Sequence, residues 1–168
     1  GGPRMSDPKG VLRDYLGQGR RHVLGILEGL SDEDLRRPLL PSGWSCLGLV
    51  QHLALDVEQF WFRRVVAGET LGSDDPVTEN AWQLDPAVPA EVVLDLYRRE
   101  CERSDEVLAA TDLDAPPRWW PDWFGAWRMD DLREIAMHVV TETACHAGHL
   151  DTARELVDGR QWMVLTES

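Results

Sequence analysis

The sequence lacks any apolar run close to the roughly 20 residues that a membrane-spanning helix needs, and its first ten residues lack the apolar stretch of a secretory signal peptide. Cysteine is scarce as well. Cys46, Cys101 and Cys145 are widely spaced and form no C-x-x-C pair, which argues against a zinc knuckle or a redox dithiol. These absences predict a cytoplasmic protein with reduced thiols and no membrane partner.

Positive charge is also in short supply. The chain has 17 Lys and Arg residues against 30 Asp and Glu, a formal net charge of −13 that repels phosphate backbones and anionic lipids. We therefore expect no nucleic-acid partner. The length of 168 residues, with 43% hydrophobic residues, suits one globular domain. Residues 1–4 precede Met5 and are interpreted as a remnant of expression cloning, which leaves a single domain over 5–168.

Apolar residues recur at helical spacing in four long segments. These segments cover residues 11–30, 45–68, 89–110 and 130–156. The stretch 69–89 turns to Gly, Ser, Asp, Thr and Pro, which indicates a surface loop. Strand-like alternation and internal repeats are absent. The sequence therefore predicts an all-α fold, a four-helix bundle with a long connection between its second and third helices.

Histidine is concentrated in the last predicted helix, where His138, Glu142, His146 and His149 follow one another at separations of three or four residues. At about 100° per residue these side chains share one helix face. Glu142 and His146 have the spacing by which one helix offers two ligands to a metal ion. The competing interpretation is a solvent-facing polar stripe with charge pairs one turn apart.

A third metal ligand must come from another helix. His52, flanked by leucines in the second predicted helix, is the candidate, although this setting is also typical of a hydrogen-bonded core histidine. Asp56 lies one turn after His52, and His149 one turn after His146. We expect Asp56 and His149 to have catalytic roles, either in proton transfer or in orienting the ligands.

Two segments carry a resemblance to a known family. PSGWSCLGLVQHLALDVEQFWFRRVVAG and HVVTETACHAGHLDTARELVDG resemble the signature segments of the DinB-like superfamily. The branch that they resemble holds the N-terminal domain of mycothiol-dependent maleylpyruvate isomerase and the mycothiol S-transferases. The resemblance runs from Tyr15 to Gly159 and implies a four-helix bundle with a divalent metal, commonly zinc. Carried onto this chain, the family's ligand pattern falls on His52, Glu142 and His146.

The resemblance also implies a metal-dependent thiol S-transferase or isomerase. Its partners would be a small-molecule thiol, with mycothiol as the candidate co-substrate, and an electrophilic substrate. Nickel and iron are alternatives to zinc. Metal-assisted hydrolysis competes, although the HExxH pattern is absent. An iron-dependent enzyme and a non-enzymatic metal-binding stress protein are the further alternatives.

Aromatic residues crowd the connection before the last helix, RWWPDWFGAWRM. We expect Trp119, Trp123 and Trp127 to bind substrate as a wall near the mouth of the site. The alternative is packing in the core or across a homodimer interface, where tryptophan is common.

Overall fold

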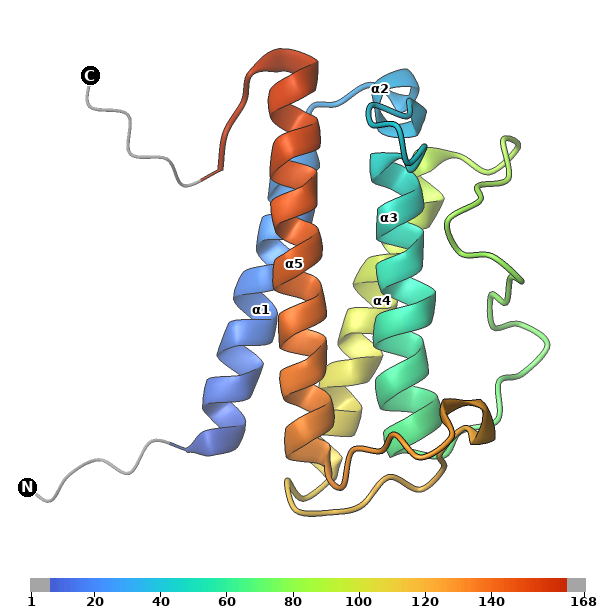
Figure 1. Ribbon diagram of the computed structural model, residues 1–168, viewed down its shortest axis with the longest axis vertical. Coiled ribbons are helices and arrows are strands. Elements are labelled where there is room, and N and C mark those ends of the chain that lie inside the picture. Colours follow the sequence, from blue (N-terminus) through green and yellow to red (C-terminus); the bar gives the residue numbers. More distant parts are fainter. Residues whose placement is uncertain (1–6, 163–168) are drawn as a thin grey trace, which may run out of the picture.

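The computed structural model describes residues 7–162, and every regular element in that range is helical. Four long helical segments lie alongside one another as a bundle (Figure 1). In chain order the elements are α1 (Pro8–Leu27), α2 (Asp32–Arg36), α3 (Cys46–His52), η1 (Leu53–Val66), α4 (Ala90–Ala110), η2 (Asp122–Phe124) and α5 (Leu132–Asp158). The predicted all-α class is confirmed. The predicted cloning remnant, residues 1–4, lies outside the described residues.

Local sequence explains where the helices begin and end. The side chains of Ser31, Ser45 and Asp131 each accept a hydrogen bond from a backbone N–H in the first turn of α2, α3 and α5, respectively. Gly159 ends α5 in the left-handed conformation, with a φ of 77° that other residues rarely adopt. Among residues 7–162, no helix combines the length and hydropathy needed to cross a bilayer.

The second long segment differs from the uniform helix predicted over 45–68. After His52 it continues as η1, a π-helix, whose last turn shows the wider pairing of the Ala67 N–H with the Phe62 carbonyl at 3.0 Å. η1 buries 11 of its 14 residues, three of them polar or charged, so no narrow apolar face marks the change from α-helix to π-helix. π-Helical turns are frequent at functional sites.

The core holds an ion pair as well as apolar side chains. Glu58 of η1 is fully buried and accepts two hydrogen bonds from Arg20 of α1, both at 2.8 Å. Arg20 also donates to Asp105 of α4 at 2.6 Å. Burial by itself would lower the pKa of Arg20, but the adjacent Glu58 carboxylate outweighs it and raises that pKa. These contacts join three helices across the bundle.

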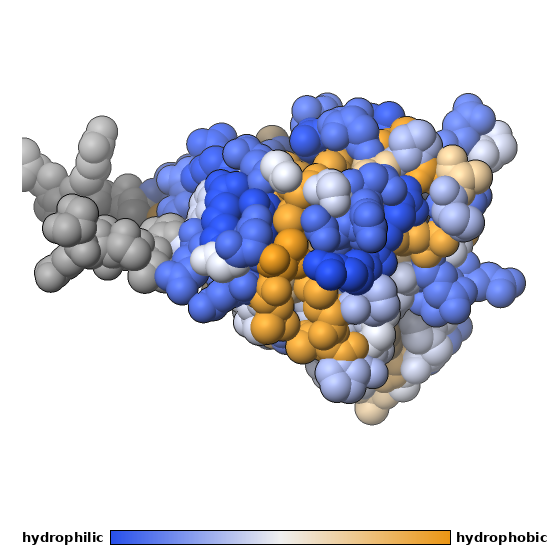
Figure 2. Space-filling model, turned by 90° about the horizontal axis from the view of Figure 1, so that it is seen from above, coloured by the Kyte–Doolittle hydropathy of each residue, from blue (hydrophilic) through white to orange (hydrophobic). Residues whose placement is uncertain are grey.

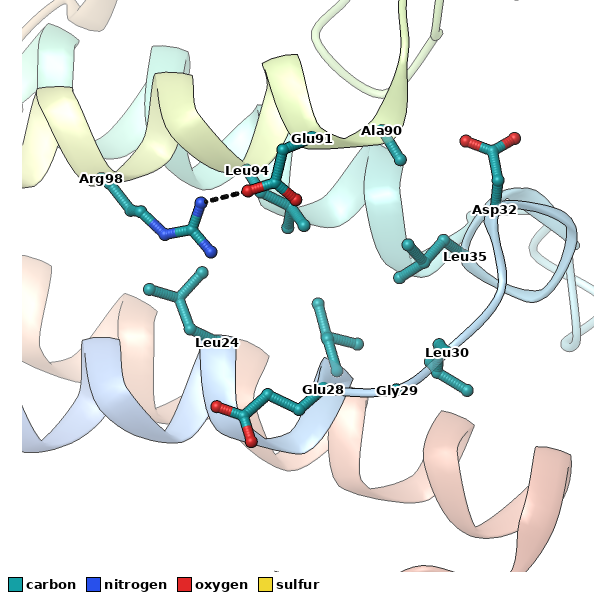
Figure 3. A pocket seen from close by; sticks show the side chains of 11 residues that line it. Leu24, Glu28, Gly29, Leu30, Asp32, Leu35, Ala90, Glu91, Leu94 and Arg98 are labelled. Atoms are coloured by element: carbon teal, nitrogen blue, oxygen red, sulfur yellow. Dashed lines mark hydrogen bonds and ion pairs between the residues drawn. The ribbon is translucent and has the colours of Figure 1, made fainter.

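One end of the bundle carries a cavity of about 480 Å³ between α1, α2 and α4 (Figure 3). Five of its 11 lining residues are leucines, and Arg98 donates to Glu91 at 2.7 Å along its edge. Figure 2 looks at the molecule from above and shows a strip of hydrophobic atoms between hydrophilic areas. None of the predicted site residues lines this cavity.

Candidate metal centre

The structure brings His52, Glu142 and His146 together. His52 is the last residue of α3, and the other two lie one turn apart on α5, which runs in the opposite direction beside α3 (Figure 1). Taking one ligand atom from each residue, the three atoms all lie within 4.8 Å of one another. His146 Nε2 is 3.3 Å from Glu142 Oε2. The imidazole rings of His52 and His146 meet edge to face at 5.1 Å.

The cluster lies on the seam, the line along which α3 and η1 face α5, and it is partly exposed to solvent. The side chains of His52 and His146 are 16% and 14% exposed, and that of Glu142 is 36% exposed. Fully buried apolar side chains such as Leu53 and Val139 belong to the core on the same two helical segments. Each of the three cluster side chains, in contrast, keeps some contact with solvent.

The donor set fits a divalent metal. Two imidazoles and one carboxylate are the ligands of many catalytic zinc sites, which keep a fourth position open. Bonds of about 2.0–2.2 Å put neighbouring ligand atoms roughly 3.3 Å apart in a tetrahedral site. The three atoms here lie within 4.8 Å of one another, and small rotations of partly exposed side chains can bring them to that spacing. Burial, together with the nearby His52, lowers the pKa of His146 and favours the neutral form that binds metal.

Two further predicted residues contact the cluster. Asp56 Oδ2 lies 2.8 Å from Nδ1 of His52, so the carboxylate can accept the Nδ1–H and leave Nε2 free. His149 Nδ1 lies 3.4 Å from His146 Nδ1, and its side chain is exposed. The structure thus places both residues beside a histidine of the cluster. Their catalytic roles stay predictions.

His138 lies close both to Glu142 of the cluster and to Trp127 of the aromatic segment before α5. Its Nε2 lies 3.9 Å from Glu142 Oε1, too far for a hydrogen bond. The ring of Trp61 packs edge-on against it at 4.9 Å, and that of Trp127 lies at 6.1 Å. Burial lowers the pKa of His138, so this side chain favours the neutral state.

A model of the mycothiol S-transferase family matches residues 11–159, which include the whole of both segments that carry the resemblance. The chain belongs to the mycothiol S-transferase family. The resemblance to the DinB-like mycothiol branch is thereby confirmed. Searches of curated proteins and of solved structures found no match.

In this family member, the three tryptophans that were predicted to bind substrate lie at the end of the seam near His138. Trp119 packs against Phe60 of η1, and the Arg64 guanidinium lies over its ring at 4.9 Å. Trp123 and Trp127 are 66% and 47% exposed. Within the described residues, none of the three indoles packs against the ring of His52 or His146. Trp127 approaches the cluster through His138, and the substrate-binding role stays a prediction.

Sequence reasoning missed a tryptophan that is closer to the cluster. Trp82, in the loop after η1, stacks on the ring of His52 at 4.3 Å with 20° between the planes. It lies 5.9 Å from His146. A large apolar residue in a stretch of Gly, Asp and Pro has no periodic partners, so it must find its contacts in tertiary structure. That isolation is the only signal that could have singled it out.

Two residues of α3 hold the loop against the helix. The Gln51 amide donates to the carbonyls of Ala81 and Gln83 at 2.8 and 3.0 Å. A Cβ atom on Gly48 would stand only 2.7 Å from the Trp82 carbonyl oxygen. Only glycine therefore allows this approach, which places the Trp82 indole on His52.

Replacing Gly48 with alanine should lower the free energy of unfolding by about 1–3 kcal/mol, because the methyl group forces the loop away from α3. Gly148 is the matched control: it is also helical, and a Cβ there meets nothing within 4 Å. Gly148→Ala should raise the free energy of unfolding by about 0.5–1 kcal/mol. Urea unfolding of both variants makes the comparison. Equal stability of Gly48→Ala and the parent would contradict the close contact.

Proposed function

We propose that the chain is a divalent-metal-dependent thiol S-transferase whose metal is held by His52, Glu142 and His146. The observation that carries the proposal is the convergence of two imidazoles and a carboxylate, from two facing helices, within 4.8 Å. Membership of the mycothiol S-transferase family supports a thiol substrate. Zinc fits the donor set best, with nickel and iron as alternatives.

Glu142, Asp56 and His149 each have a separate role in this proposal. Glu142 contributes the negative charge that partly neutralises a divalent cation. Asp56 accepts the Nδ1–H of His52 and so keeps Nε2 directed at the ligand position. His149 is exposed beside His146, where it can take up the proton that a thiol loses and pass it to solvent.

A bound divalent ion supplies the charge that lowers the pKa of a thiol, so that the thiolate is available at neutral pH.

The substrates we propose are mycothiol, or a similar small thiol, and an electrophile that accepts its sulfur. Both can enter along the seam because the cluster is partly exposed. Trp119, Trp123 and Trp127 would form a wall at the end of the seam marked by His138. The exposure of Trp123 and Trp127 is equally suited to a homodimer contact, which is the alternative for this segment.

The test is product formation from a thiol and 1-chloro-2,4-dinitrobenzene, with the protein first stripped of metal and then loaded separately with zinc, nickel or ferrous iron. We expect conjugate formation to require both the metal and the thiol. Metal-dependent release of product without thiol would overturn the proposal in favour of a hydrolase. Activity that requires iron and oxygen together would favour an iron-dependent enzyme.

A further inference from the structure

A cavity of about 350 Å³ opens directly beside the candidate metal centre. It is lined by Ser42, Gly43, Trp44, Trp82 and Gln83. Both of its indoles reach the histidines of the site: Trp82 stacks on His52 at 4.3 Å, and Trp44 lies 6.1 Å from His149. A molecule in this cavity therefore lies next to residues that contact the histidines of the site.

The residues that line this cavity carry no charge. Its two large walls are indole rings, and the only polar side chains are the Ser42 hydroxyl and the Gln83 amide. By contrast, four larger cavities of about 450–550 Å³ on the described part of the chain each include an arginine. A charged ligand would lose the hydration of its charge on entering, and no charged side chain of the lining would replace it. A neutral ligand has no such cost, so the cavity beside the cluster favours neutral ligands.

The volume of the cavity also limits the size of the ligand. A volume of about 350 Å³ lies near the lower limit of the roughly 300–1,000 Å³ typical of small-molecule pockets. One substituted ring fits this space better than an extended molecule. Aromatic rings gain from offset or edge-to-face contact with indoles, and the Gln83 amide and Ser42 hydroxyl can serve substituents at the rim.

We propose that this Trp44–Trp82 pocket binds the acceptor substrate, a neutral electrophile with a planar ring. The inference rests on the proposed function, since it assigns one of the two substrates of that reaction. With 1-chloro-2,4-dinitrobenzene as the acceptor, the thiolate sulfur forms a bond to the ring carbon that carries chlorine. Chloride leaves with the electrons of the broken bond, and the thiol proton passes to solvent. The thiol would then bind at the end of the seam beside His138.

Binding can be tested without catalysis. The probe is 1,3-dinitrobenzene, a planar neutral ring with no halide leaving group, measured by equilibrium dialysis against the metal-free protein. We expect saturable binding that Trp44→Ala weakens about five- to tenfold, because one stacking wall is lost. Ser42→Phe, which fills the cavity instead of opening it, should weaken binding as much. Trp162→Ala removes an indole that stacks on His22 outside the pocket and should leave binding unchanged.

The variants also separate this inference from the proposed function. If Trp44→Ala and Ser42→Phe bind the probe like the parent, or if Trp162→Ala alone loses it, the pocket assignment is wrong even where conjugation is observed. In the conjugation assay, Trp44→Ala should raise KM for the chlorinated ring and leave KM for the thiol unchanged. Pocket-dependent binding in a protein with no transferase activity would support the pocket and count against the proposed function.

Discussion

Alanine at His52 or at His146 should abolish stoichiometric zinc binding and all thiol-dependent product formation. Each substitution leaves only two ligands, which do not hold a catalytic ion well. The cost to folding should be small, because both side chains lie on the seam while apolar side chains fill the core. Metal content after gel filtration, the rate of conjugation and urea unfolding measure the three effects. His22→Ala is the matched control, since His22 also meets a carboxylate, Asp151, but lies outside the cluster.

Glu142→Gln tests the same assignment more sharply. Glutamine keeps the size of the side chain but removes the charge that offsets a divalent cation, so metal content and activity should both fall. Glu155→Gln, an exposed position on the same helix, is the control and should change neither. If the Glu142 variant kept its metal and activity, the third ligand would have to be His138 or His149.

Glu58→Ala should lower the free energy of unfolding by about 3–5 kcal/mol, the largest stability effect that we expect in the chain. The loss comes from Arg20, which is only 7% exposed and would keep its charge with Asp105 as its remaining carboxylate partner. Urea unfolding gives the difference. Replacing Arg20 and Glu58 together with methionine should restore most of the lost stability, because no unpaired charge is then buried.

An exposed ion pair provides the matched comparison for Glu58. Glu91 pairs with Arg98 at 2.7 Å, but both side chains are well exposed to water. Glu91→Ala should therefore change the free energy of unfolding by no more than about 1 kcal/mol. A Glu58 variant as stable as the Glu91 variant would mean that the buried pair contributes little to the fold.

The sequence alone was sufficient for the features that depend on neighbours along the chain. Helix periodicity and capping residues such as Ser45 and Asp131 act within a few residues, and the predicted long helices are present in the structure. The same local geometry put Glu142 and His146 on one face of the last helix. Periodicity could not tell whether that face meets a second helix or solvent. The flanking leucines made His52 a candidate third ligand, and the family resemblance indicated the same residue.

Tertiary structure decided what depends on contacts between distant segments. It brought His52 to the α5 pair and placed Trp82 on His52 through the close approach at Gly48. It also paired Glu58 with Arg20, residues 38 apart in the chain. Hydrophobic patterns report which side of a helix is buried but not which partner covers it. Partners are chosen by packing and by the need to satisfy every buried charge, and both conditions are met only when the whole chain is folded.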